Sequence, residues 1–241
     1  MDDIFQELKR RLLQMDAVHR LLSESFRVTA RPLSVEEAVG HPEEQDFPLQ
    51  KGKESLMQAE FRGALGQAFT DQYGDFQARL EEILEMPLNN NFRRAVFTAS
   101  LNALMRYLSA AEKTIHCRDQ EPRRCADELL RFFETAYPGA KILQVGFQPR
   151  MIEALGKRFP MRVLDLDPDN IGTVRFGVPI EGPDAQAEAR QWAEVLLVTG
   201  TTLVNDTIGG FLTEKPVVFY GTTIAGGAAL MGWRRFCAEG H

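Results

Sequence analysis

Two thiols, one imidazole and two carboxylates occur within ten residues of the chain, and these are side-chain types that bind transition metals. They belong to His116, Cys117, Asp119, Glu121 and Cys125. Thiolate and imidazole suit borderline-soft metal ions, and carboxylates complete many such sites. The spacing differs from the short cysteine gap of a zinc knuckle, so further ligands from elsewhere would be required. The segment thus predicts a transition-metal site without naming the metal.

The same segment also has a purely structural interpretation. Pro122 suits the first turn of a helix, and Glu121 just before it complements the positive end of the helix dipole. Cys125 then lies in register with the apolar face of that helix, and free cysteine is among the most buried residue types. A position near the helix start would lower the pKa of Cys117 and make it a better ligand or nucleophile. Both interpretations stay open on sequence alone.

Two apolar runs each end in a small turn rich in hydroxyl groups. The runs are residues 195–198 and 217–220, and each suits a strand that is buried on both faces of a parallel sheet. Ligands of open α/β sheets bind beyond the carboxyl ends of such strands. The turns contain more threonine than helix capping requires, so we predict that they face a ligand. The predicted ligand-binding residues of the two turns are Thr199, Gly200, Thr201, Thr202, Asn205, Gly221 and Thr222.

Three further residues follow predicted strands on the same side. Gly146 stands at a strand-to-helix turn, where a dinucleotide-binding fold keeps a glycine-rich fingerprint. Only one glycine of that fingerprint occurs here, so ordinary NAD or FAD binding is not expected. Asp165 and Asp167 end the next strand, where an acid holds a ribose hydroxyl in Rossmann-type folds or caps a turn. We therefore add these three residues to the predicted ligand site and leave both roles open.

The order of predicted elements divides the chain near residue 138. Residues 1–138 predict a smaller α+β domain, and residues 139–241 predict strands alternating with helices, which is typical of a Rossmann-like α/β domain with a parallel sheet. The elements expected in the first part are a helix at 2–24, a strand at 26–32, a loop at 36–53, a strand at 61–70, and helices at 75–85, at 92–111 and from 122. Those expected in the second part are strands at 141–146, 161–165, 195–199 and 217–221, and helices at 149–159, 184–193, 203–212 and 225–236.

Bulk properties exclude several classes of protein. The net charge of −6 over 241 residues argues against a general nucleic-acid binder, because phosphate contacts require a positive surface. No apolar run is long enough to span a membrane, and the acidic start is not a secretory signal. Three cysteines without such a signal suit reduced thiols in the cytoplasm. Uncovered sheet edges and apolar helices favour a homodimer.

Short motifs along most of the chain resemble the DUF364 family, known as a heavy-metal chelation domain, with its associated DUF4213-type N-terminal domain. The motifs are Gly66–Asp71, Asn91–Ala95, Leu101–Ala103, His116–Cys125, Val145–Gly146, Leu166–Pro168 and Val198–Thr207. The resemblance implies an N-terminal domain like that of enolases, a Rossmann-like C-terminal domain and a cleft between them. It also implies that the protein handles a metal ion or a metal-bearing small molecule.

Three functional hypotheses follow. The first is a protein that binds a metal ion, or a metal-bearing or anionic small molecule, in the interdomain cleft. The alternative is an enzyme with a nucleotide-like or S-adenosylmethionine-like cosubstrate, in which Asp165 or Asp167 holds the ribose and Cys117 or Glu121 acts on the substrate. The third is a dimeric scaffold whose threonines only cap helices. The sequence contains no phosphate-binding loop, zinc-protease motif or nucleophile elbow that would decide the reaction.

Overall fold

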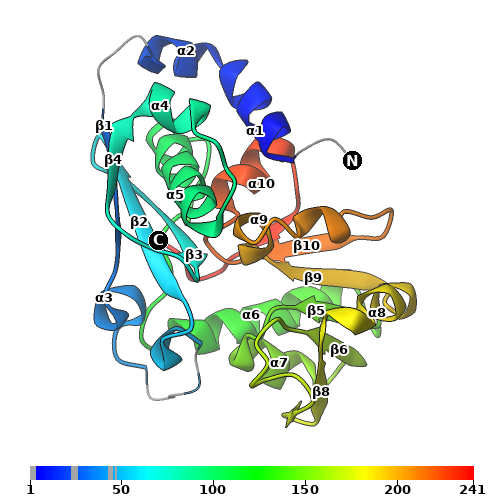
Figure 1. Ribbon diagram of the computed structural model, residues 1–241. Coiled ribbons are helices and arrows are strands. Elements are labelled where there is room, and N and C mark those ends of the chain that lie inside the picture. Colours follow the sequence, from blue (N-terminus) through cyan, green and yellow to red (C-terminus); the bar gives the residue numbers. More distant parts are fainter. Residues whose placement is uncertain (1–3, 23–26, 43–45, 47) are drawn as a thin grey trace.

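The chain forms two β-sheets with helices between and around them (Figure 1). The computed structural model describes residues 4–22, 27–42, 46 and 48–241. The first sheet is antiparallel, in the order β3-β2-β1-β4. Its strands are β1 (Arg27–Pro32), β2 (Ser55–Phe61), β3 (Ala64–Thr70) and β4 (Phe76–Arg79). Helix α5 (Asn91–Tyr107) packs on β2 and β3, and its buried residues are mostly small or apolar.

The second sheet has seven strands in the order β11-β10-β9-β5-β6-β8-β7. All its pairs are parallel except that of β7 with β8. From β5 the chain adds β6 and β8 toward one edge of the sheet, and from β9 it adds β10 and β11 toward the other edge. The strand order therefore reverses between the neighbours β5 and β9. The strands are β5 (Ile142–Val145), β6 (Met161–Leu164), β7 (Val174–Arg175), β8 (Val178–Glu181), β9 (Val195–Thr199), β10 (Val217–Tyr220) and β11 (Arg235–Phe236). A crevice is expected beyond the carboxyl ends of strands at such a reversal.

The central strand β9 is buried on both faces, as its apolar run predicts. Leu196 and Val198 belong to one hydrophobic core and Val195 and Leu197 to another, because side chains alternate along a strand. One face is covered by α6 (Glu121–Ala136) and α7 (Pro149–Leu155). The core on the other face includes residues of α8 (Gln186–Trp192), α9 (Thr201–Val204) and α10 (Ala225–Met231), and it continues through α5 and α1 (Ile4–Leu13) to the first sheet.

Helix α6 lies before residue 138 in sequence but packs on α7 and on the second sheet. Helix α10 contacts α5 and α1, which belong to the first part of the chain. The two parts therefore exchange helices: α6 packs in the core on one face of the second sheet, and α10 packs in the core that reaches the first sheet. The boundary at residue 138 stays a prediction.

Several element predictions were wrong for identifiable reasons. The expected helix at 75–85 begins as strand β4 and becomes α4 (Leu80–Glu85) only at Leu80. The expected helix at 225–236 ends at Met231, because Gly232 adopts a left-handed conformation, and β11 follows. The expected helix at 203–212 is the short α9 followed by the 3₁₀ turn η3 (Ile208–Gly210), where two glycines interrupt it.

In the N-terminal part, two regions differ from the sequence predictions. Strand β2 was missed, although Arg62 and Gly63, both with positive φ, form the tight turn that joins it to β3. The expected loop at 36–53 contains α3 (Val35–Val39), which Ser34 and Glu37 start with a capping box. The expected helix at 2–24 divides into α1 and α2 (Asp16–Leu22). Residues 2, 3, 23, 24, 26, 43–45 and 47 of these predictions lie outside the described residues.

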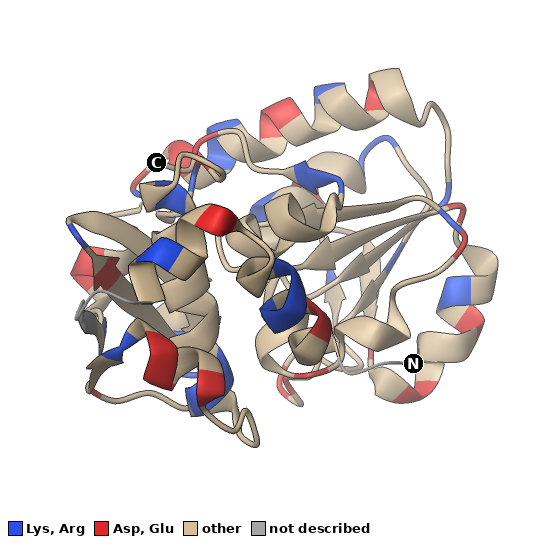
Figure 2. Cartoon of the chain, turned by 90° about the horizontal axis from the view of Figure 1, so that it is seen from above, with Lys and Arg blue, Asp and Glu red and all other residues tan. Residues whose placement is uncertain are grey.

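Surface charge is mixed in sign. Figure 2 shows Lys and Arg interspersed with Asp and Glu on the helices and loops of both halves. Among the described residues, the helices are too short or too polar to cross a bilayer.

Candidate functional site

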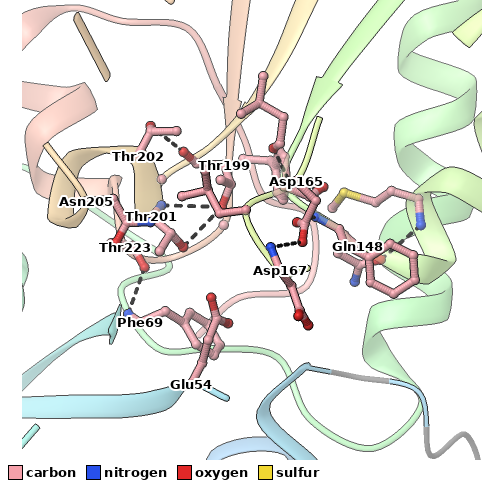
Figure 3. A pocket seen from close by; sticks show the side chains of 18 of the residues that line it. Glu54, Phe69, Gln148, Asp165, Asp167, Thr199, Thr201, Thr202, Asn205 and Thr223 are labelled. Atoms are coloured by element: carbon pink, nitrogen blue, oxygen red, sulfur yellow. Dashed lines mark hydrogen bonds between the residues drawn. The ribbon is translucent and has the colours of Figure 1, made fainter. Parts of the chain in front are cut away.

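A cavity of about 810 Å³ lies where the first sheet faces the carboxyl ends of β5, β6, β9 and β10. Figure 3 shows Glu54 and Phe69 on one side and the threonine-rich turns with Asp165 and Asp167 on the other. We call this cavity the cleft. Its volume is in the range that holds small-molecule ligands. All ten residues of the predicted ligand site line it, namely Gly146, Asp165, Asp167, Thr199, Gly200, Thr201, Thr202, Asn205, Gly221 and Thr222.

Gly146 shapes the floor of the cleft through its backbone. Its φ is +92°, and a Cβ atom there would lie 2.8 Å from Thr199 Cγ2 and 3.0 Å from Tyr220 Oη. The Tyr220 hydroxyl in turn donates to the carbonyl groups of Val145 and Gly146. Glycine is therefore required both for the conformation and for the close approach of β5, β9 and β10.

We expect Gly146→Ala to lower the free energy of unfolding by about 2–3 kcal/mol, because it adds a steric contact to backbone strain. Gly139→Ala is the matched control, because Gly139 also has positive φ (+72°) but no atom within 4 Å of its Cβ position. The control should lose only about 1 kcal/mol. Urea denaturation of both variants measures the difference, and equal losses would contradict the steric account.

The threonines of the first turn partly satisfy one another. The Thr201 N–H donates to Thr199 Oγ1 at 3.3 Å, and the Thr202 hydroxyl donates to the Thr199 carbonyl at 2.7 Å. These bonds stabilise the start of α9. The hydroxyl groups of Thr199 and Thr202 are therefore paired within the fold and do not require a ligand. The Thr222 hydroxyl is 1% exposed and has no partner among the described residues, although it lines the cleft. Buried hydroxyl groups are normally paired, so the hydroxyl group of Thr222 is the one in these turns that the fold leaves without a partner among the described residues.

Asn205 belongs to a network that joins the two sheets. Asn91 Nδ2 donates to Asp71 Oδ1 at 2.6 Å and more weakly to Asn205 Oδ1 at 3.4 Å. Arg94 Nη2 fixes the amide of Asn91 by donating to its oxygen at 2.6 Å. The network places the Asp71 carboxylate at the cleft from the first sheet, a position that sequence reasoning did not assign to the site.

The two predicted aspartates are held by close contacts. Asp165 Oδ2 accepts the Phe147 N–H at 2.7 Å, and Asp165 Oδ1 accepts the Asp167 N–H at 2.9 Å. Asp165 therefore ties the turn after β5 to the turn after β6. Asp167 pairs with Lys53 Nζ at 2.6 Å, an ion pair that reaches across the cleft and lowers the pKa of Asp167 against the effect of burial.

Glu54 is a cleft residue that the sequence analysis missed. Burial, with the nearby charges of Asp165, Asp71 and Asp167, raises the pKa of Glu54 to about 7. A carboxyl group that burial and neighbouring carboxyl groups bring to a pKa near neutrality is typical of functional sites. Glu54 lies just before β2, and because that strand was missed, no signal placed its side chain at the cleft.

The five predicted metal ligands are not brought to one point. His116, Cys117 and Cys125 line the cleft, whereas Asp119 and Glu121 are not among its lining residues. Asp119 accepts the His41 N–H at 2.8 Å, and Glu121 accepts the Arg118 N–H at 2.7 Å. These two carboxylates therefore stabilise the loop before α6.

His116 is neutral at physiological pH, because burial lowers its pKa to about 4. Its ring packs edge-on against Phe69 at 5.1 Å between centroids, and its buried Nδ1 has no partner among the described residues. In the part of the chain that the structure describes, no three His, Cys, Asp or Glu side chains are placed to hold a metal together. Any metal at the cleft would therefore need fewer protein ligands, or ligands of its own.

The comparisons with known proteins agree on one family. Residues 128–225 match the DUF364 family model, described as "Putative heavy-metal chelation". A protein of unknown function from the DUF364 family of Pyrococcus horikoshii is similar in structure, with a TM-score of 0.56 and 15% identity over 91% of this chain and 79% of that one. One from Desulfitobacterium hafniense has a TM-score of 0.49 and 12% identity over 73% and 72% of the two chains. No curated protein matches.

At 15% identity, the first similarity shows the fold alone: a mixed α/β fold with a largely parallel sheet. The predicted DUF4213-type N-terminal domain stays a prediction. The matched segment contains strands β5 to β10 and the turns that line the cleft. Over residues 128–225, the chain thus carries the signature of the DUF364 family.

Proposed function

We propose that the protein binds a metal ion or a metal-bearing, cationic small molecule in the cleft. The observation that carries this proposal is an excess of carboxyl groups, which we call the acidic wall: Glu54, Asp71, Asp165 and Asp167. Among the described residues that line the cleft, Lys53 is the one Lys or Arg, and it is paired with Asp167. In a partly enclosed cavity such an excess attracts cations more strongly than it would in water.

The negative charge of the cleft also favours one of the two ligand classes that the sequence left open, a metal-bearing ligand and a nucleotide-like one. A nucleotide would bring phosphates toward the acidic wall, and like charges repel. The carboxylate of Asp165 already accepts backbone N–H groups and that of Asp167 already binds Lys53, so fewer acceptors are left for a ribose. A cationic metal complex does not meet the first difficulty, because opposite charges attract. The description of the matched family supports the same choice.

The fold supports the proposal at a coarser level. In chain order the parallel strands β5, β6, β8, β9, β10 and β11 take the spatial order 3-2-1-4-5-6, which is typical of Rossmann-like domains. We therefore retain the Rossmann-like class for residues 139–241. For residues 1–138 we retain an enolase N-terminal-like class, based on the antiparallel sheet and its covering helices.

Calorimetric titration tests the proposal, with hexaamminecobalt(III), Mn²⁺ and Ni²⁺ as cationic probes and ATP and NAD as anionic ones. We expect at least one cationic probe to bind and both nucleotides to fail. At pH 8, where the carboxyl group of Glu54 is ionised, Glu54→Gln should weaken binding of the cation by about tenfold, because it removes one charge at short range. Glu60→Gln, on the exposed side of β2, is the control and should have no effect.

Two results would overturn the proposal. Binding of a nucleotide that Asp165→Asn weakens would favour the alternative, an enzyme with a nucleotide-like cosubstrate. S-adenosylmethionine, which carries both a nucleoside and a positive charge, is titrated separately for that reason. The absence of binding by every probe would favour a scaffold whose turns serve only the fold.

A further inference from the structure

All three cysteines of the chain line the cleft, although Cys237 lies far from the other two in sequence. Cys117 lies in the loop before α6, Cys125 in α6, and Cys237 directly after β11. We call this set the thiol wall. All three thiols are free. The sequence analysis assigned Cys117 and Cys125 to a site but gave Cys237 no role.

The last residues of the chain bring Cys237 to the other two. The backbone of His241 exchanges two hydrogen bonds with that of Ile115, at 2.9 and 3.0 Å. Lys113 Nζ donates to the Ala238 carbonyl at 2.6 Å, and Arg124 of α6 pairs with Glu239 at 3.0 Å. Residues 238–241 are thus bound both to the segment before Cys117 and to the helix of Cys125.

Two of the three thiols have a raised pKa. Burial raises the pKa of Cys117 well above its usual range, and negative charge on Cys125 or Cys237 would raise it further. Burial also raises the pKa of Cys125, and the backbone N–H groups of Ala238 and Glu239 oppose that shift. The raised pKa values favour the protonated form of Cys117 and Cys125 in the free protein, and a bound cation would favour their ionisation.

A fixed positive charge stands beside the thiol wall. The guanidinium group of Arg235 donates to the carbonyl groups of Gly221, Glu112 and Lys113 at 2.9, 3.0 and 2.6 Å. Burial lowers its pKa, while the charges of Cys237 and Cys125 act in the opposite direction. Arg235 could therefore balance one negative charge on a pair of thiolates.

The number of available ligands selects the class of metal. Zinc sites need four ligands in a tetrahedron, and the described residues hold no preformed group of three. Soft ions such as Cu(I) and Hg(II) are satisfied by two thiolates in a line, and thiolates select such ions. We propose that the thiol wall binds one soft, thiophilic metal ion through two of its sulfur atoms.

For Cu(I), two S–H bonds break, two Cu–S bonds form and two protons leave to solvent, with no change of oxidation state. The product carries one negative charge, which faces Arg235. The inference extends the proposed function by naming the class of metal. It rests on the proposed function in one respect, that the cleft is a binding site.

Anaerobic titration of the full chain with Cu(I) against bicinchoninate tests the inference. We expect the protein to remove one equivalent of Cu(I) from the chelator and to leave Zn²⁺ with a zinc indicator. At least two of the variants Cys117→Ser, Cys125→Ser and Cys237→Ser should weaken Cu(I) by about 100-fold or more, because one thiolate is lost from a pair. Asp127→Asn, on the exposed side of α6, is the control and should bind Cu(I) as the natural protein does.

A second measurement does not depend on whether the serine variants fold. Bound Cu(I) should protect two cysteines from iodoacetamide in the natural protein, as counted by mass spectrometry. The inference is overturned if Cu(I) stays with the chelator or protects no cysteine. If Cu(I) fails but hexaamminecobalt(III) binds, the proposed function stands and the thiol wall is ruled out as the metal site. If Cu(I) binds and every other cationic probe fails, the cleft binds a metal ion through the thiol wall, and the acidic wall is ruled out as a cation site.

Discussion

Replacing Asn102 by aspartate should lower the free energy of unfolding by about 3–5 kcal/mol, the cost of a buried charge without a partner. The Asn102 side chain is fully buried in α5, and its Nδ2 donates to the carbonyl groups of Gln67, Thr222 and Thr223 at 2.8, 3.1 and 3.0 Å. Its oxygen accepts the Gly226 N–H at 2.6 Å. Aspartate has the same shape but would direct an oxygen at three carbonyl oxygens, which repel it.

Guanidinium chloride denaturation at neutral pH measures this loss. Asn89→Asp is the matched control, because Asn89 is exposed just before α5, and we expect a change within about 0.5 kcal/mol. A loss in Asn102→Asp no larger than in the control would mean that the amide bonds do not hold the turn after β10. Because Thr222 and Thr223 belong to the cleft, the variant should also lose affinity for any cleft ligand.

Asn102 illustrates what a sequence can predict about this fold. A polar residue inside an apolar helix requires a hydrogen-bond partner, and this much follows from α5 alone. Its partners lie 35 residues before it, in Gln67, and 120 and 121 residues after it, in the turn that follows β10. No local pattern encodes that separation, so the sequence predicts the need for a partner and not its identity.

Some of the cleft residues could likewise be predicted from local sequence patterns, and others could not. Those after β5, β6, β9 and β10 could be grouped, because the carboxyl ends of parallel strands lie at one edge of a sheet. Glu54 and Asp71 enter from the antiparallel sheet, and Cys237 is brought in by the pairing of residues 238–241 with the segment before α6. These contacts depend on how the two sheets pack, which the periodicity of the chain does not contain.

The pH dependence of stability should report directly on Glu54. Its pKa is about 7 in the folded protein against an ordinary value of 4.5, so the folded state retains a proton that the unfolded state has released. Stability therefore falls as pH rises from about 4.5 to 7, and the loss is complete above that range. The shift corresponds to about 3 kcal/mol as an upper limit, since the side chain is only partly buried.

Glu54→Gln removes the titrating group and should be more stable than the natural protein by about 2 kcal/mol at pH 8. At pH 4.5 the natural carboxyl is protonated in the folded state, so the two proteins should differ little. Urea denaturation between pH 4.5 and 8.5 gives the difference curve, with Glu60→Gln as the exposed control that should stay flat. A difference that does not change with pH would mean that Glu54 is well solvated. The expected gain in stability of Glu54→Gln at pH 8 would show instead that the natural carboxyl group destabilises the fold. Such a cost is expected of a residue that binds a ligand, because binding sites are often less stable than the rest of a protein.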